Sequence, residues 1–164
     1  MKYLLSDNSL LKIEFQDSAG QERSHLLIEL YYKKHDCILL IYDITDRSSF
    51  EDCKTYFCNQ IKEKCKKDIK VILIGNKIDL EEKREVSYEE GANFAFLNNW
   101  LFIEISCLNI QNVFDCFNKS LEISLEKNQE ILKDKIIFNR HEIFIVNSLY
   151  KSSYINKLLS HINN

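Results

Sequence analysis

The stretches Asp17-Ser18-Ala19-Gly20-Gln21-Glu22-Arg23 and Asn76-Lys77-Ile78-Asp79 decide the fold of this chain. Each follows an apolar run with the length of a strand, Leu10 to Phe15 before the first and Val71 to Ile74 before the second. Open sheets of alternating strands and helices bind ligands in loops at the ends of buried strands. The two stretches therefore predict an α/β fold with a ligand site at one edge of its sheet.

Further strands and helices alternate along the chain. Cys37 to Tyr42 and Trp100 to Ile105 are also apolar, although Glu104 interrupts the second run. Ser48 to Glu51 and Ser87 to Glu90 have the spacing of capping boxes that begin helices. A third helix is expected from apolar residues at helical spacing, Val113, Phe117, Leu121 and Leu125. Short apolar runs separated by helices predict a doubly wound, mostly parallel sheet whose strands are buried on both faces.

The first residues predict a β-hairpin. Tyr3 to Leu5 and Leu10 to Phe15 are strand-like, and the polar residues Ser6 to Ser9 lie between them. Leu11, Ile13 and Phe15 alternate with polar residues. We therefore expect the second arm to be more exposed on one face than a central strand is.

The character of the sequence changes after about residue 127. Lys135 to Asn139 and Glu142 to Val146 are short strand-like runs, and apolar residues at helical spacing follow over residues 155–162. We expect one domain over residues 1–126 and a divergent tail over residues 127–164, with a strand-like segment and a helix.

Composition excludes several classes of protein. The 164 residues suit a single domain, and the net charge of −3 argues against a nucleic-acid partner. None of the six cysteines forms a C-x-x-C pair, so we expect reduced thiols rather than a zinc site or disulfides. The sequence shows no signal peptide and no apolar run of about 18 residues, which indicates a cytoplasmic protein.

Asp79 has the chemistry to distinguish guanine from adenine. A carboxylate at the end of a buried strand can accept hydrogen bonds from the N1–H and the exocyclic amine of guanine together, and adenine offers no such pair of donors. Asn76 would brace the neighbouring loops, and the Lys77 stem would cover the base. The alternative is an ordinary turn, because Asn and Asp are common turn residues.

The first stretch suits the phosphate end of a nucleotide. Asp17 could hold Mg²⁺ through water, and the Gly20 amide could approach a γ-phosphate because glycine has no side chain. Gln21 could orient an attacking water. Asp-Ser-Ala-Gly alone is also compatible with a plain turn.

Five segments together resemble the Rab family of Ras-superfamily GTPases, from about residue 2 to residue 125. Asp17 to Arg23 resembles the D-T-A-G-Q-E-R motif, and Asn76 to Asp79 is the N-K-x-D motif. Tyr31-Tyr32 matches the tyrosines of switch II. Ile41 to Thr45 matches the V-Y-D-[IV]-T segment, and Glu104 to Leu108 lies where the family has E-T-S-A-K. The tyrosine pair and the Y-D-[IV]-T segment resemble Rab proteins more than other branches.

The resemblance implies a small GTPase that binds GTP or GDP with Mg²⁺ and acts as a switch in vesicle traffic, peripheral to endomembranes. It implies guanine contacts from Asn76, Lys77 and Asp79, and from the backbone amides of Ser106 and Cys107. It further implies Mg²⁺ at Asp17, γ-phosphate sensing at Gly20 and catalysis by Gln21. Exchange factors, GTPase-activating proteins and effectors would bind through Ser24 to His35.

The sequence also departs from the family pattern. Its three glycines cannot build the G-x-x-x-x-G-K-[ST] phosphate loop, and nothing at its start matches the family's first strand, first helix or switch I. Gln16 replaces a tryptophan, and Leu108 replaces a lysine that helps to cover the base. The last cysteine is Cys116, so we expect no C-terminal lipid anchor in this chain.

The missing first strand has a structural consequence. In this family it lies between the strands that here end at Asp17 and Asp43, so its loss would leave unpaired backbone on both sides. We hypothesise that Glu142 to Val146 fills this gap and that a helix over residues 151–162 follows. Lys151-Ser152-Ser153 resembles the end of a phosphate loop, but Ile145 and Tyr150 occupy its glycine positions. The alternative is a tail that packs loosely elsewhere.

Three interpretations of function stay open. The chain is a Rab-type switch with impaired GTP binding and hydrolysis, a nucleotide-independent interaction module of the same ancestry, or a truncated gene model of an ordinary Rab. Whether it is an active GTP hydrolase is left undecided by the sequence.

Overall fold

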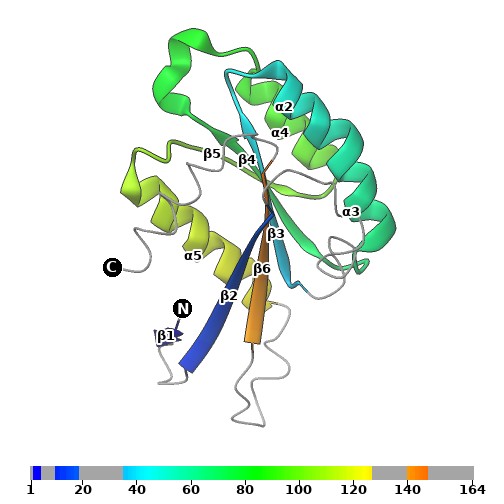
Figure 1. The fold of residues 1–164 in the computed structure, drawn as a ribbon, viewed down its shortest axis with the longest axis vertical. Coiled ribbons are helices and arrows are strands. Elements are labelled where there is room, and N and C mark those ends of the chain that lie inside the picture. The colour runs from blue at the N-terminus through cyan, green and yellow to red at the C-terminus, as the bar shows by residue number, and fades with distance from the viewer. Residues whose placement is uncertain (1, 5–9, 19–34, 127–139, 148–164) are drawn as a thin grey trace.

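A computed structural model of the chain describes residues 2–4, 10–18, 35–126 and 140–147, and it describes side chains for Gln16 and residues 35–124. The central feature is a six-stranded sheet with the order β1-β2-β6-β3-β4-β5 (Figure 1). Its strands are β1 (Lys2–Leu4), β2 (Leu10–Ser18), β3 (Cys37–Asp43), β4 (Lys70–Asn76), β5 (Leu101–Ile105) and β6 (Arg140–Asn147).

All neighbouring strands are parallel except the first pair. β1 pairs with β2 in antiparallel register, with Tyr3 opposite Leu11, so the N-terminal hairpin is confirmed. β3 pairs with β4, and β4 with β5, in parallel register. The predicted doubly wound, mostly parallel sheet is therefore also confirmed.

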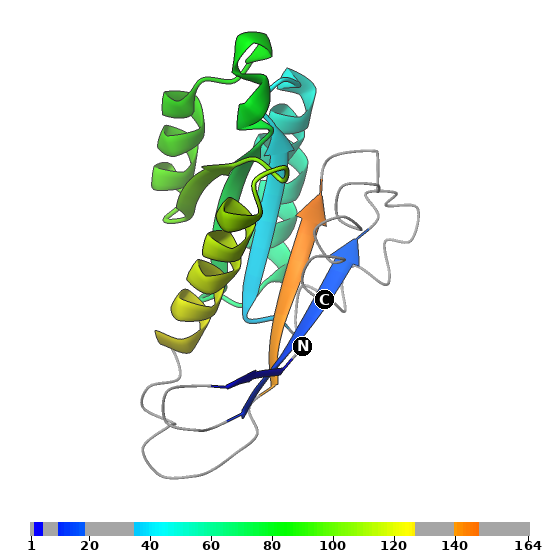
Figure 2. The same ribbon diagram turned by 90° about the vertical axis from the view of Figure 1, so that its left-hand side faces the viewer.

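Strand β6 lies between β2 and β3 and runs parallel to both (Figure 2). Ile145 is opposite Asp17 on one side and Leu39 on the other. The hypothesis that Glu142 to Val146 lies between the strands that end at Asp17 and Asp43 is confirmed, and both neighbouring strands gain hydrogen-bond partners for their backbone. The expected strand at residues 135–139 and the helix over residues 151–162 lie outside the described residues.

Helices cover both faces of the sheet (Figure 1). α2 (Arg47–Asp52), a π-helical segment η1 (Cys53–Phe57) and α3 (Cys58–Lys64) form one nearly continuous helix on the same face as α4 (Tyr88–Leu97). α5 (Ile110–Glu126) covers the other face. A short 3₁₀ helix, η2 (Ile78–Lys83), follows β4.

Alternate residues of β3 enter two separate cores, as the period of a strand dictates. Leu39 and Ile41 pack toward Val113, Phe117 and Leu121 of α5, which confirms three of the four residues of its predicted apolar face. The side chain of the fourth, Leu125, lies outside the described residues. Ile38, Leu40 and Tyr42 belong to the core that contains residues of α2, α3 and α4.

The edge strand β5 differs from the prediction. Four of its five residues are only half-buried, because no described strand covers its outer edge. The expectation that this strand is buried on both faces is therefore wrong.

One of the two predicted helix starts is also wrong. The Ser87 capping box is present, with Ser87 and Glu90 exchanging side-chain-to-backbone hydrogen bonds. At the other start, however, the cap is Asp46, whose carboxylate accepts hydrogen bonds from the backbone N–H groups of Ser48 and Ser49. The Ser48 hydroxyl donates to the same carboxylate at 2.6 Å. The carboxylate is the stronger acceptor, so the helix begins two residues earlier than expected.

Candidate nucleotide-binding site

The predicted site residues lie where parallel strands end. Asp43 ends β3, Asn76 ends β4, and Ser106 follows the last residue of β5. Asp43 is level with Asn76, and Asn76 is level with Ile105. The sheet therefore brings these residues to one edge, which we call the carboxyl edge.

Asn76 joins two of the loops at this edge. The residue is 2% exposed, and its Oδ1 accepts a hydrogen bond from the backbone N–H of Cys107 at 3.2 Å. Its carbonyl oxygen accepts another from the N–H of Ile44 at 3.0 Å. Asn76 thus holds the loops after β3 and β5 against the end of β4.

Asp79 is exposed and is oriented by Ser106. The Ser106 hydroxyl donates to Oδ1 of Asp79 at 2.5 Å and accepts a hydrogen bond from the N–H of Leu108 at 3.1 Å. Within residues 35–124, no group hydrogen-bonds to Oδ2 of Asp79. The carboxylate is therefore fixed at one oxygen, while the other can accept a hydrogen bond from a ligand.

Lys77 connects the loop to β3. Its Nζ forms an ion pair with Oδ2 of the buried Asp43, whose Oδ1 accepts hydrogen bonds from the backbone N–H and the hydroxyl of Thr45. Lys77 has a φ of 73°, a left-handed conformation that costs a non-glycine residue about 1–2 kcal/mol. A strained residue held by such contacts often marks a functional loop.

Arg84 holds η2, which carries Asp79, against the sheet. Its guanidinium donates to both carboxylate oxygens of Glu104 on β5, at 2.7 and 2.9 Å, and to both of Glu81, at 2.8 and 2.6 Å. It also donates to the carbonyl of Val86 at 2.9 Å. The two carboxylates raise the pKa of Arg84, so its charge is constant at any ordinary pH.

Sequence reasoning missed Asp43, Arg84 and Glu104 as parts of this site. Glu104 gave a signal, because it interrupts an otherwise apolar strand and a buried carboxylate needs a partner. Arg84 gave none that a single sequence can show, since its partner lies 20 residues further along the chain.

Cys107 has an engaged backbone and a neutral side chain. Its N–H already donates to the Asn76 side chain. The backbone N–H of Ser106 has no acceptor among the described residues, so it is the better donor to a ligand oxygen. Burial raises the pKa of the Cys107 thiol to about 11, although a hydrogen bond with Asn76 lowers it in part. The thiol is therefore protonated at neutral pH.

The residues predicted for the phosphate end are described only in part. Asp17 and Ser18 are the last residues of β2, which ends at the same edge because β2, β6, β3 and β4 are all parallel. Through β6, Asp17 is level with Leu39, four residues or roughly 13 Å before Asp43 along the strand direction. Gly20, Gln21 and residues 24–34 lie outside the described residues.

The described residues fit the base of a guanine nucleotide. Asp79 offers an acceptor oxygen to solvent, and the aliphatic stem of Lys77 crosses the same loop toward Asp43. For Mg²⁺, residues 35–124 contain no group of three or more His, Cys, Asp or Glu side chains that could hold a metal ion.

Comparison with known proteins agrees with these observations. The model of the Ras family matches residues 1–126. The Ras-related protein Rab-11B of Dictyostelium discoideum is 39% identical over 136 residues, which are 81% of this chain and 61% of that protein. The Ras-related protein Rab-17 of Homo sapiens is 36% identical over 73% of this chain and 57% of its own length. The GTP-binding protein ypt2 of Schizosaccharomyces pombe is 38% identical over 68% of this chain and 55% of its own length.

These matches cover most of this chain but only 55% to 61% of each relative. The match to the family model ends where α5 ends, so β6 lies beyond it. On the extent of the family match and on the identities to Rab proteins, the chain belongs to the Ras family and is a Rab-type small GTPase.

Proposed function

We propose that this chain binds guanine nucleotides through Asp79 and acts in intracellular vesicle traffic, with impaired binding and hydrolysis of GTP. The observation that carries the proposal is the Asp79 carboxylate, which Ser106 orients through one oxygen while the other is open to a ligand. Oδ1 keeps a second lone pair beside its bond to Ser106, so the two oxygens together can accept from a ligand with two neighbouring N–H donors.

Guanine presents those two donors on one side of its ring. Its N1–H and exocyclic amine would donate to the Asp79 carboxylate, the Ser106 amide would donate to the ring oxygen, and the Lys77 stem would cover one face. Adenine would leave the carboxylate unpaired, and a site built around such a hydrogen bond rejects the wrong ligand strongly.

The phosphates would be held less well. The family's phosphate loop uses closely approaching backbone amides, and the three glycines of this sequence are at positions 20, 75 and 91. A nucleoside of about 20 heavy atoms at roughly −0.3 kcal/mol per atom gives about −6 kcal/mol, or a Kd of tens of micromolar. Gln21 would then have no firmly held γ-phosphate on which to act.

The remaining roles rest on family membership. Asp17 would hold Mg²⁺ through water, and Gly20 would approach a bound γ-phosphate. Effectors, exchange factors and GTPase-activating proteins would bind through Ser24 to His35, at the periphery of endomembranes. Mg²⁺ bound with the phosphates would supply charge neutralisation there.

Isothermal titration calorimetry with guanosine, GDP and GTP, each with Mg²⁺, tests the proposal. We expect all three to bind with Kd values in the tens of micromolar and within about threefold of one another, because the base supplies most of the affinity. Adenosine should show no binding at the same concentrations.

Two results would contradict the proposal in different ways. If guanosine fails to bind below about 100 µM, the nucleotide-independent interaction module becomes the better interpretation. That second function is favoured by the lack of glycines for a phosphate loop. If GTP binds a hundredfold more tightly than guanosine, GTP binding is not impaired, and Lys151→Ala would show whether the tail supplies the contact.

A further inference from the structure

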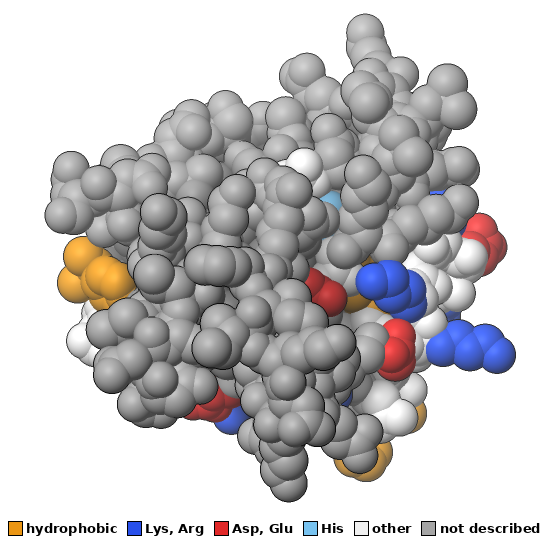
Figure 3. Space-filling view, turned by 90° about the horizontal axis from the view of Figure 1, so that it is seen from below, with side chains coloured by type: hydrophobic (Ala, Val, Ile, Leu, Met, Phe, Trp, Pro, Cys, Tyr) orange, Lys and Arg blue, Asp and Glu red, His pale blue; other side chains and the backbone are white. Residues whose placement is uncertain are grey.

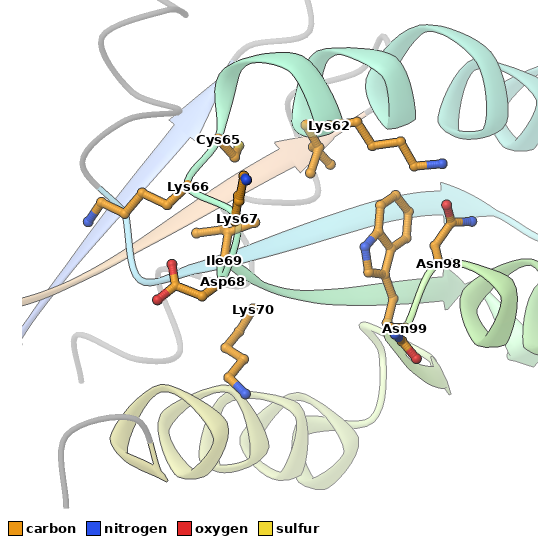
Figure 4. A pocket seen from close by; sticks show the side chains of 11 residues that line it. Lys62, Cys65, Lys66, Lys67, Asp68, Ile69, Lys70, Asn98 and Asn99 are labelled. Atoms are coloured by element: carbon orange, nitrogen blue, oxygen red, sulfur yellow. The ribbon is translucent and has the colours of Figure 1, made fainter. Parts of the chain in front are cut away.

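A lysine-rich pocket lies at the opposite end of the sheet from the candidate nucleotide site. It has a volume of about 710 Å³ and is formed by the end of α3, the loop into β4 and the turn before β5 (Figure 4). Lys70 is the first residue of β4, while Asn76 is the last, about 20 Å away along the strand. The pocket and the carboxyl edge are therefore separate.

Positive charge is concentrated around this pocket. Residues 61–70 contain five lysines and two acidic residues, Glu63 and Asp68, although the whole chain has a net charge of −3. Lysines near the end of α3 are explained by the helix dipole, but those beyond the helix are not. Within the described part of the chain, four lysines of the lining take part in no ion pair: Lys62, Lys66, Lys67 and Lys70.

The lysine side chains spread apart rather than converge. Figure 4 shows Lys62, Lys66 and Lys70 extending in three different directions from the walls of the pocket. A single small anion is best held by donors that point at one place. Amines that are spread across a face suit an extended anionic surface better.

Exposed apolar side chains accompany the lysines. Phe96 and Leu97, in the last turn of α4, are each 80% exposed. The chain then turns tightly into the pocket wall, since the N–H of Asn99 donates to the Phe96 carbonyl at 3.1 Å and that of Trp100 to the Ala95 carbonyl at 2.9 Å. The half-buried Trp100 lines the pocket itself.

Figure 3 views the molecule from the end of the sheet where the parallel strands begin. Lysine or arginine, acidic and hydrophobic side chains are all exposed on the described part of this end. Positive charge beside exposed apolar groups is the combination that binds proteins to anionic membrane surfaces. No described helix is both long and apolar enough to cross a membrane.

We propose that Lys62, Lys66, Lys67, Lys70, Phe96 and Leu97 form a membrane-binding surface, which docks on an anionic lipid bilayer. The lysines attract the negative headgroups, and Phe96 and Leu97 enter the boundary between headgroups and acyl chains. The carboxyl edge then faces away from the bilayer, so a nucleotide and its partners can reach it while the chain is bound.

Sedimentation with lipid vesicles tests this proposal without any nucleotide, so the result is independent of the proposed function. We expect the full chain to bind vesicles of phosphatidylcholine with roughly 30% phosphatidylserine, and not vesicles of phosphatidylcholine alone. Binding should weaken as salt is raised, because Lys62, Lys66 and Lys67 are exposed and their charges are screened.

Two triple variants with the same net charge separate the surface from general charge. Lys62→Gln with Lys66→Gln and Lys67→Gln should weaken binding at least tenfold, because each lysine near an anionic membrane contributes about fivefold. Lys54→Gln with Lys83→Gln and Lys119→Gln should retain binding within about twofold. Phe96→Ser with Leu97→Ser should weaken it several-fold, and circular dichroism checks that every variant is folded.

Three outcomes would overturn the proposal. Equal loss in the two triple variants would mean that binding follows net charge alone. A lack of binding to the anionic vesicles would exclude a lipid surface. Inositol hexakisphosphate provides the third outcome. If it binds saturably, is unaffected by the Phe96 and Leu97 substitutions and displaces the chain fully from vesicles, the pocket is a site for a small polyphosphate instead.

Discussion

The two halves of the sheet are assembled in different ways. In the base half, which is residues 35–126, β3, β4 and β5 follow one another and are joined by helices that cover the sheet. In the terminal half, β1 and β2 come from the start of the chain and β6 from a segment more than 120 residues later. One half forms from connections between neighbours, while the other needs the two ends of the chain to meet, which is slower and entropically more costly.

The difference also divides the candidate site. Asn76, Lys77, Asp79 and Ser106 all belong to the base half, where short loops and the Arg84 network fix them. Of the residues proposed for the phosphate end, Asp17 belongs to the terminal half, where β6 lies beside β2. The proposed recognition of the base therefore depends on residues of the base half alone.

The largest effect is expected from breaking β6. Ile145→Pro removes a backbone N–H from a strand with partners on both sides, which should destabilise the chain by at least about 3 kcal/mol. Urea denaturation followed by circular dichroism measures the loss.

Lys2→Pro is the matched control for that substitution. Lys2 is the first residue of the edge strand β1, where proline should cost less than about 1 kcal/mol. If the two substitutions have the same small effect, β6 does not complete the sheet in solution.

A substitution in the base half should cost about 1–3 kcal/mol, the usual range for overpacking of a core. Gly91→Ala would place a methyl group 2.6 Å from the Phe102 ring and from the Tyr42 hydroxyl. Alanine favours helices over glycine, so a destabilisation measured by thermal unfolding would show that packing decides the effect. Asn93→Ala, on the exposed face of the same helix, should be neutral or slightly stabilising.

Arg84→Lys should lower both the stability of the base half and its affinity for guanosine. Lysine cannot reproduce the fork to Glu104 and Glu81, and the loss of these hydrogen bonds should cost about 1–2 kcal/mol of stability. Guanosine affinity should also fall, because η2 positions Asp79. Arg47→Lys, which breaks an exposed fork to Glu90, should leave guanosine affinity unchanged in the same titration.

The smallest expected effect is a loss of stability at low pH through the protonation of Glu90. The guanidinium of Arg47 and the backbone N–H of Ser87 lower the pKa of Glu90 from 4.5 to about 2. Because the folded pKa is lowered, the stabilisation is present above pH 4.5 and is lost as the pH falls toward 2. The difference in melting temperature between the unaltered chain and Glu90→Gln should shrink over that interval, and a difference that grows would contradict the assignment.

The sequence predicted the base half well because its signals are local. Apolar runs gave β3 and β4, the Ser87 capping box gave the start of α4, and the spacing of Val113, Phe117 and Leu121 gave the buried face of α5. The start of α2 was predicted incorrectly because Asp46 and Ser48, two residues apart, can both accept hydrogen bonds from the first turn, and spacing alone cannot decide between them.

Other features depend on contacts that are distant in sequence. The place of β6 could be argued only from a gap in a sheet of known topology, because nothing in Glu142 to Val146 itself specifies its neighbours. The Arg84 fork and the ion pair of Lys77 with Asp43 were not foreseen, since each joins residues 20 or more positions apart. The sequence named the residues that we propose to read the base, and the structure adds those that hold them.

Exchanging the base specificity tests the central claim most directly. In xanthine a carbonyl replaces the exocyclic amine of guanine, so an amide in place of the Asp79 carboxylate can donate to that carbonyl and still accept from N1–H. Asp79→Asn is therefore predicted to lose guanosine binding in calorimetry and to gain binding of xanthosine at tens of micromolar. If Asp79→Asn binds guanosine as the unaltered chain does, Asp79 does not read the base and the account is wrong.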